Sequence, residues 1–586
     1  NTKPAAESGN LATALRTWAL KENISQSALT SLLKVLKAHL SDTSCLPSDA
    51  RALLRTPRDT MHVSAQTPMP PGEYCHFGLE YQLRNVMSHR APEGRSVVLS
   101  FNVDGLPISK SSRLQLWIIQ CLVVDSCRAA PFVVGVFAGP SKPESANEFL
   151  TPFVTELRQL MSCGLSFKGQ IFQVLVKSFI CDAPARSFIF CIKGHMGYSG
   201  CPKCCVEGMY VSNRVVFPPK SSTFRTDDSF RRQTDPDHHH NVSVLTSLPI
   251  DCIKSAPLDY MHLLCLGVMK KLINLWLAGP LSLRLGPAER RKLSDMNVLL
   301  APHVPREFVR KPRSIAEFDR WKATEFRLFL FYTGPLVLKS ILTPAVYTHF
   351  LTLHCGAFLL ASPTLCHRYV DYAESLLQHF VKVFKNLYGG DHMSYNVHCL
   401  LHIADDVRNQ GPLDSFSAFP FENNMQFLKR LLKRHSAPLT QLYNRLKERE
   451  ELEPMTRSLP PTVQLERQHT DTPLPTGCSP PLYRCATFHD FKLVAGTADN
   501  CCMVEDSVIL VEGFAHLTST LAPCIIGREF MVKENFYSKP FLSAQIGIFV
   551  VSQPSTLKCW PADGVHKLIR LPFFDKSIVI PQLHTY

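Results

Sequence analysis

The chain has 586 residues and a formal net charge of +14. Hydrophobic residues make up 45% of the sequence and charged residues 19%, which excludes a mostly disordered chain and leaves room for several domains with large cores. The positive charge favours a polyanionic partner, nucleic acid first, although a merely basic soluble protein also fits the charge alone.

The 21 cysteines are an odd number and are scattered, several of them inside apolar runs such as those around Cys121 and Cys181. This pattern predicts reduced thiols in an intracellular protein rather than a disulfide framework. No apolar run reaches the roughly 18 residues of a membrane helix, so we expect no membrane partner. Because the chain begins with Asn1, we expect the natural start to lie upstream, together with any targeting signal there.

Residues 1–90 are predicted to form an N-terminal helical region. Apolar residues spaced three and four apart predict helices over 11–21 and 25–40, and Ser25 or Ser27 is the candidate N-cap of the second. Two helices joined by a short turn fit either a DNA-reading helix-turn-helix or an ordinary packed pair.

From residue 96 the pattern changes to that of strands. Three strands are predicted within 96–139, a helix over 145–164 and a fourth strand over 172–184. This order predicts a mixed α/β sheet, and we assign its first part to 95–212. Asp104 falls at the end of the first strand and Asp182 at the end of the fourth.

The rest of the chain divides by composition. Residues 213–397 are predicted to be a mostly helical insertion that opens with a polar loop. The triple histidine 238–240 lies in that loop, and a solvated position argues against metal binding there. Residues 398–450 complete the core. The Pro-rich stretch 451–482 is predicted to be a linker, and 483–586 a small all-β module whose role no motif indicates.

Two aspartates at the ends of adjacent strands suit Mg²⁺, with Mn²⁺ as a substitute, and a pair of such ions supports phosphodiester cleavage. A third carboxylate is needed, and Glu422 is the candidate that we favour. Pro420 opens its helix, and Glu422, Lys429 and Lys433 share one face. The two lysines would neutralise neighbouring phosphates. The alternative is an ordinary amphipathic helix with a solvated face.

The pair Cys201 and Cys204 supplies two of the four ligands that a structural zinc site needs. His398 and His402, four residues apart on a predicted helix, can supply the other two. One zinc ion would then join the segment after the second aspartate to the segment before the candidate glutamate.

Three alternatives to this zinc site stay open. In the first, the two histidines are core residues. In the second, Cys205 or His195 completes a local site with the cysteine pair. In the third, the cysteines bind nothing.

These residues, in this order, resemble a DDE transposase of the CACTA-like (CMC) type and, more distantly, the V(D)J recombinase catalytic subunit. The resemblance covers roughly residues 95–435. The blocks that are similar to such transposon-encoded proteins are "FNVDGLPISKSS", "KGHMGYSGCPKCCVEG", "PLDYMHLLCLGVMKKL" and "HIADDVRNQGPLDSFSAFPFEN".

The resemblance implies an RNase H-like core interrupted by a large helical insertion, in a nuclear enzyme that acts as a homodimer. Asp104, Asp182 and Glu422 would hold two Mg²⁺ ions for cleavage at transposon ends and strand transfer into target DNA, and the cysteine and histidine pairs would hold structural zinc. Such families also show the residues Asp259 and His262, which either support a metal-binding residue or make a core hydrogen bond.

A basic stretch with Arg320 and Lys322 also includes Trp321 and Phe326, which fits either a DNA path or a solvated helix face. Two other functions stay open. One is a domesticated, non-catalytic, transposase-derived DNA-binding protein, and the other is a zinc-stabilised helical scaffold without a nucleic-acid role.

Overall fold

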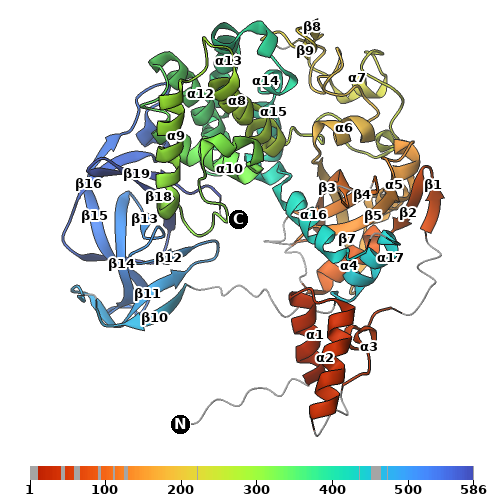
Figure 1. Cartoon of the computed structure of the whole chain (residues 1–586), viewed down its shortest axis with the longest axis horizontal. Helices are drawn as coiled ribbons and strands as arrows, with labels where there is room; N and C mark the ends of the chain where they lie inside the picture. Colours follow the sequence, from red (N-terminus) through yellow and green to blue (C-terminus); the bar gives the residue numbers. More distant parts are fainter. Residues whose placement is uncertain are drawn as a thin grey trace. The chain divides into compact units, whose positions relative to one another are not determined.

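The structure is a computed structural model that describes residues 11–40, 46–57, 66–89, 94–109, 113–124, 130–220, 222–434, 436–450, 463–471 and 473–584. The fold is mixed α/β and divides into two compact units, coloured along the chain in Figure 1. Unit 1 consists of Asn1–His195, Thr226–Pro257 and Ala418–Ser458, and unit 2 of Met196–Arg225, Leu258–Ser417 and Leu459–Tyr586. Each unit is therefore assembled from segments that are distant in sequence.

The central strands of unit 1 follow the predicted order of three strands, a helix and a fourth strand. The first three are antiparallel neighbours, and the fourth runs parallel to the first on its other side. The Ser145 hydroxyl accepts a hydrogen bond from the Glu148 amide at the start of the intervening helix, which ends at Gly164. These elements are β3 (Ser96–Pro107), β4 (Gln115–Val123), β5 (Phe132–Gly139), α5 (Ala146–Cys163) and β7 (Gln170–Phe179).

The sheet is wider than predicted. Its seven strands have the order β1-β2-β5-β4-β3-β7-β6, in which β1 (Gln66–Met69), β2 (Gly72–His76) and β6 (Leu165–Phe167) extend the two sides. Each of these strands is three to five residues long. Strands this short have too few residues for an alternating pattern to stand out, which explains why they were missed.

Helices cover both faces of this sheet. One face packs against α4 (Leu79–His89), α5 and α6 (Ala183–Ile189) in the larger core of unit 1. The other face packs against α16 (Phe419–Leu431) and α17 (Pro438–Lys447), whose buried residues Met425, Leu428 and Leu442 belong to a second core. The last segment of unit 1 is thereby fixed on the sheet by apolar burial.

Three N-terminal helices pack in a core of their own, which includes Leu20, Leu29 and Leu53. Two of them were predicted, and the Ser25 hydroxyl accepts the hydrogen bond from the Ala28 amide that its N-cap position requires. The helices are α1 (Leu11–Lys21), α2 (Gln26–His39) and α3 (Ala50–Leu54). A helix-turn-helix role for them stays a prediction.

The middle of the chain is helical, as predicted, and most of it belongs to unit 2. The helices there are α8 (Lys270–Ala278), α9 (Pro287–Leu299), α10 (Ala323–Leu328), α11 (Gly334–Val337), α12 (Pro344–Ala361), α13 (Cys366–Tyr388), α14 (Tyr395–Cys399) and α15 (Ile403–Gln410). Met261–Ala278 and Pro344–Ala361 are long and apolar enough to cross a membrane, although most of each is buried inside the structure, as in the core helices of soluble proteins.

The boundaries of the predicted insertion are wrong. The polar loop was assigned to it, yet Thr226–Pro257 belongs to unit 1, with α7 (Asp227–Arg231) at its start. Leu245, Leu248 and Cys252 pack in the larger core of unit 1, and this burial outweighs the polar composition of the loop around them.

The C-terminal module is all-β, as predicted, and six of its strands pair in a closed ring, because β14 pairs with both β13 and β15. Cys501, Val508, Phe530, Val551 and Leu568, each from a different strand, form one core. The strands of the module are β10 (Gln464–His469), β11 (Cys478–Thr487), β12 (Lys492–Val494), β13 (Cys501–Val504), β14 (Ser507–Leu517), β15 (Pro523–Asn535), β16 (Phe549–Pro554), β17 (Lys558–Pro561), β18 (Val565–Phe573) and β19 (Lys576–Pro581).

The predicted linker is also partly wrong, because β10 and the start of β11 lie within it; its residues 451–462 lie outside the described ranges.

A buried ion-pair group ties the module to the helical part of unit 2. The Lys567 ammonium contacts the carboxylates of Glu307 at 2.6 Å and Asp499 at 2.7 Å.

Candidate functional site: three carboxylates and a Cys/His cluster

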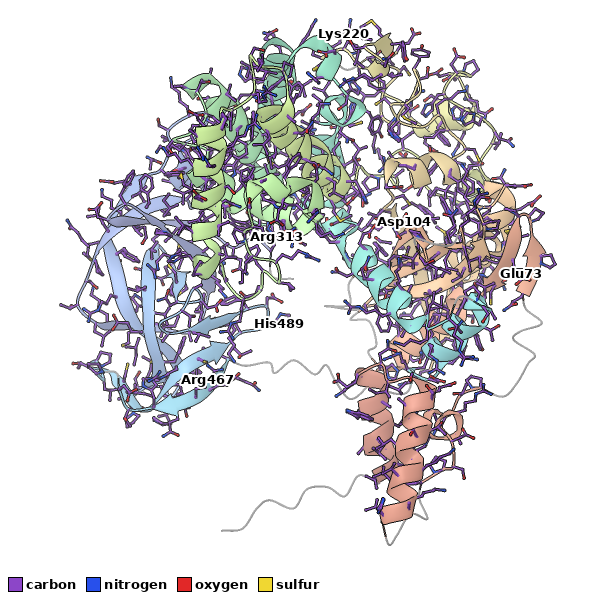
Figure 2. All side chains as sticks on the ribbon, viewed as in Figure 1. Glu73, Asp104, Lys220, Arg313, Arg467 and His489 are labelled. Carbon is purple, nitrogen blue, oxygen red and sulfur yellow. The ribbon has the colours of Figure 1, made fainter. Side chains whose placement is uncertain are left out.

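Asp104 lies near the end of β3, on the sheet face that α16 covers. Its side chain is half-buried, and one of its carboxylate oxygens accepts a hydrogen bond of 2.6 Å from the Gly105 amide. Figure 2 labels this residue among the side chains of unit 1. A central strand gives the carboxylate a rigid support.

Asp182 lies just beyond β7, which runs beside β3 in parallel. The Ile180 amide continues this pairing by donating a hydrogen bond to the Phe101 carbonyl, so the two aspartates leave the sheet at the same edge. Asp182 is also the N-cap of α6, where its carboxylate accepts a hydrogen bond of 2.7 Å from the Ala185 amide. Both the strand and the helix therefore position it.

Glu422 lies in the first turn of α16. The apolar side of that helix, Met425, Leu428 and Leu431, is buried in the same core as Leu106 and Ile118 of the sheet. This packing within unit 1 places Glu422 beside Asp104 and provides a reason for its position that does not involve the Cys/His cluster.

The electrostatics of Asp104 show that the three carboxyl groups converge. Burial, the neighbouring charges of Glu422 and Asp182, and a hydrogen bond to Glu422 together raise the pKa of Asp104 to about 8. Burial is the largest of these causes, and the contributions of Glu422 and Asp182 place both carboxylates near Asp104. Perturbation of this kind is typical of functional positions.

The raised pKa predicts how stability depends on pH in buffer free of Mg²⁺ and Mn²⁺. The unfolded carboxyl group ionises near pH 4, whereas the folded one keeps its proton to about pH 8. This group therefore favours the folded state most at low pH, and that contribution, on the order of a few kcal/mol, is lost as the pH rises to about 8. Glu422→Gln should flatten the dependence, as measured by urea unfolding at pH 5, 6.5 and 8. Identical slopes in the two proteins would contradict the convergence.

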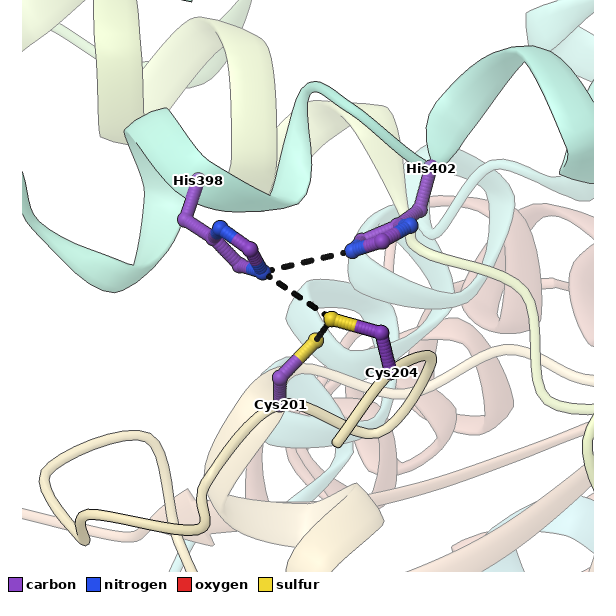
Figure 3. Close-up of side chains that lie close together, drawn as sticks. All are labelled: Cys201, Cys204, His398 and His402. Atoms are coloured by element: carbon purple, nitrogen blue, oxygen red, sulfur yellow. Dashed lines mark hydrogen bonds between the residues drawn. The ribbon is translucent and has the colours of Figure 1, made fainter. Parts of the chain in front are cut away.

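The two cysteines and two histidines form a buried cluster within unit 2 (Figure 3). Their ligand atoms all lie within 4.8 Å of one another. The distances are 3.7 Å between the two sulfurs, 3.4 Å from Cys204 Sγ to His398 Nε2, and 3.3 Å between the Nε2 atoms of His398 and His402. In Figure 3 the sulfurs approach from one loop and the imidazoles from another segment.

These distances match the edges of a tetrahedral metal site. Bond lengths of about 2.3 Å to sulfur and about 2.0–2.1 Å to nitrogen give edges of about 3.8 Å (S–S), 3.6 Å (S–N) and 3.4 Å (N–N). Burial raises the pKa of the Cys201 thiol to about 12 and lowers the pKa of His402, so charged thiolates in this position require a cation. The cluster can therefore hold a metal ion such as zinc.

Further contacts tie the two ligand-bearing segments together. The Lys203 ammonium, between the two cysteines, contacts the Asp406 carboxylate at 2.7 Å, and both side chains are buried. The other Asp406 oxygen accepts a hydrogen bond from the Leu258 amide. The Arg225 guanidinium donates to the Cys201 carbonyl. A buried ion pair of this kind specifies one arrangement of the cluster.

Two expectations about the cluster need correction. His398 lies in α14, but His402 lies after a turn and immediately precedes α15, so the two do not share one continuous helix. Cys205 is exposed, and neither it nor His195 belongs to the cluster. Among the described residues, no second group of His, Cys, Asp or Glu side chains is as tight as this cluster. The ligand atoms of the three carboxylates are therefore more widely spaced than those of the Cys/His cluster. The triple histidine 238–240 forms no such group either. His238 is nevertheless buried rather than solvated.

The candidate DNA-contacting residues are placed as follows. The Lys429 ammonium donates a hydrogen bond of 2.6 Å to the Pro107 carbonyl at the end of β3, whereas Lys433 is exposed beyond the end of α16. Arg320 and Lys322 are exposed in unit 2. Lys429 and Lys433 belong to the same unit as the three carboxylates, and the hydrogen bond to Pro107 holds Lys429 at the end of the strand that carries Asp104.

The aromatic residues of the basic stretch are not available to nucleic acid. Trp321 and Phe326 are 5% and 0% exposed, and their rings pack together at 5.4 Å. The expectation that they line a DNA path is wrong, because core packing takes up both rings. Arg313, labelled in Figure 2, pairs with Glu325 in the same stretch.

Asp259 and His262 make a core hydrogen bond in unit 2. The buried Asp259 carboxylate lies 2.7 Å from His262 Nδ1 and accepts hydrogen bonds from the amides of Met261 and His262. Both amides lie at the start of the π-helical stretch Met261–Met269. This is one of the two roles expected for the pair.

Sequence reasoning missed three polar residues close to the carboxylates, Asn102, Gln120 and Asn424. Asn102 and Gln120 are opposite each other on β3 and β4, and both are buried. The available signal was a polar residue in the middle of an otherwise apolar strand.

A family model described as a domain of unknown function (DUF8592) matches residues 468–582. The matched residues lie in the C-terminal β module, which holds none of the candidate site residues. No curated protein matches the chain. The comparisons therefore leave the function to be argued from the two sites.

Proposed function

We propose that this protein is a DNA transposase of the DDE type, a metal-dependent nuclease and strand transferase with an RNase H-like core. The observation that carries the proposal is the convergence of Asp104, Asp182 and Glu422 in unit 1. The charges of Glu422 and Asp182 help to raise the pKa of Asp104, and half-buried like charges destabilise a protein unless a cation joins them, which supports a metal-binding role. The strand order and the parallel pairing of β3 and β7 support the core assignment.

The donor set fits Mg²⁺ or Mn²⁺, which prefer carboxylate oxygens. Asp104, Asp182 and Glu422 would hold two ions about 3.5–4 Å apart. Carboxylates that bind different ions need not touch one another, so two ions fit a spacing that is wider than in the Cys/His cluster. When bound, such ions lower the pKa of a water and neutralise charge on the phosphodiester.

The residues of the chain position the reaction. Asp104 must give up the proton that its raised pKa retains, while Asp182 is held by the α6 N-terminus and Glu422 by α16. In the first step, a water oxygen would bond to phosphorus at a transposon end and the 3′ oxygen would leave. In the second, that 3′ hydroxyl would attack target DNA and displace another 3′ oxygen.

The ion in the Cys/His cluster is proposed to be structural zinc. Its four protein ligands leave no open position for substrate, which is typical of structural rather than catalytic sites. The resemblance to transposases also implies a nuclear location and a homodimer, and both stay predictions.

DNA binding should depend on the lysines near the carboxylates. We expect Lys433→Ala to reduce the slope of log affinity against log salt concentration by about 1, because one phosphate contact is lost. Arg84→Ala, which removes an exposed cation paired with Glu80 on α4, is the matched control and should leave the slope unchanged. Fluorescence anisotropy with duplex DNA at several salt concentrations measures both. Equal slopes for Lys433→Ala and wild type would remove this residue from the DNA path.

The proposal itself is tested by Mn²⁺- or Mg²⁺-dependent cleavage of DNA, with wild type beside Glu422→Gln. A chain that binds DNA and zinc but cleaves nothing would support the domesticated, non-catalytic alternative.

A further inference from the structure

Three uncharged side chains, Asn102, Gln120 and Asn424, form a hydrogen-bonded network in unit 1. Asn102 donates to the Ile180 carbonyl at 2.8 Å. The Gln120 amide group donates to Asn102 Oδ1 at 3.1 Å and to the Phe421 carbonyl at 3.5 Å, and its oxygen accepts a hydrogen bond of 2.8 Å from Asn424. Gln120 is fully buried and links all the other members.

Each end of the network is within two residues of a carboxylate. Asn102 precedes Asp104 by two positions on the same face of β3, and Ile180 precedes Asp182 by two. On α16, Phe421 and Asn424 flank Glu422. The network therefore ties together the three segments that carry the acidic residues, through Gln120 on β4.

The carboxylates repel one another, so their segments gain from a restraint in addition to the apolar packing that holds α16 on the sheet. Apolar contacts are non-directional, whereas hydrogen bonds have preferred directions and lengths. A buried amide left without partners is costly, which makes the network an all-or-none restraint. Amides also add no charge that would compete with a bound cation.

We propose that Gln120 is a positioning residue that holds α16 in register with β3 and the end of β7, so that Asp104, Asp182 and Glu422 can bind the same divalent ions. This role rests on the proposed function, because it presupposes that the carboxylates bind metal. Gln120 is not itself a ligand in this account.

The test measures Mn²⁺ affinity by calorimetry in the full-length, zinc-loaded protein. Gln120→Met keeps the side-chain volume but removes every hydrogen bond of the hub, and it should weaken Mn²⁺ binding by about 10- to 100-fold, as loss of a supporting contact does at other metal sites. Asn424→Ala removes one of the two hydrogen bonds between Gln120 and α16, at a half-buried position, and should weaken binding in the same direction. It keeps the test decisive if Gln120→Met does not fold.

Ser178→Ala is the matched control. It removes the buried hydrogen bond of 2.9 Å between Ser100 on β3 and Ser178 on β7. This bond joins two strands that the network also joins, but at a distance from the carboxylates. It should lower the Tm and leave Mn²⁺ affinity unchanged. If wild type binds Mn²⁺ and the Gln120 and Asn424 variants bind it equally well, the positioning role is wrong while the proposed function stands. If wild type binds no Mn²⁺, both fall.

Discussion

Glu422→Gln should reduce Mn²⁺-dependent nicking of supercoiled DNA by at least about 10²- to 10³-fold, and leave folding and DNA binding close to wild type. The substitution preserves the shape of the side chain but removes one of the three negative charges that would hold the ions. Loss of electrostatic stabilisation at a reacting phosphodiester typically costs two to three orders of magnitude or more in rate. Supercoiled plasmid avoids any need to know the sequence of the DNA ends.

Glu80→Gln is the control for this experiment. It removes a carboxylate of the same chemistry from unit 1, but the Glu80 side chain is solvent-accessible on α4 and pairs with Arg84, so its loss should change neither nicking nor stability. Unchanged nicking by Glu422→Gln would remove this residue from the site. A wild-type chain that nicks nothing in Mg²⁺ or Mn²⁺ would leave the two non-catalytic alternatives, a DNA-binding protein and a zinc-stabilised scaffold.

The core of unit 1 could be predicted from the sequence because its central strands are long, apolar and bounded by recognisable signals. Ser145 and Gly164 mark the ends of α5 as expected, and both aspartates fall where strands end. The short edge strands could not be predicted in this way, since β1 and β2 have only four and five residues. Local patterns carry little information over such lengths.

The candidate site was predictable as a set of residues but not as a set of contacts. The order of the acidic and zinc-type residues indicated which side chains to examine, whereas the reason for the position of Glu422 is tertiary. Sequence spacing suggested that the zinc ligands hold this residue in place, yet Met425 and Leu428 hold α16 on the sheet directly. Trp321 shows another limit of sequence patterns. An aromatic residue among basic ones is expected to be exposed, yet Trp321 is buried.

His402→Ala and Cys204→Ser should each lower the zinc content from about one ion per chain to nearly none, and each should lower the free energy of unfolding by several kcal/mol. Binding at a structural zinc site contributes directly to folding, and removing one ligand leaves the others buried around an incomplete shell. Elemental analysis after dialysis measures the zinc, and thermal unfolding measures the stability. Cys205→Ser is the matched control, because Cys205 adjoins the cluster in sequence but is exposed and outside it.

The same variants separate two explanations for the arrangement of the carboxylates. If the zinc ion were what draws Glu422 toward Asp104, loss of zinc would abolish Mn²⁺ binding as well. Because α16 is buried against the sheet by unit 1's own core, we expect Mn²⁺ affinity in His402→Ala to remain close to the wild-type value. Loss of both metals in the same variant would show instead that the zinc ion positions Glu422. Retention of zinc by His402→Ala would instead point to a local site completed by Cys205 or His195.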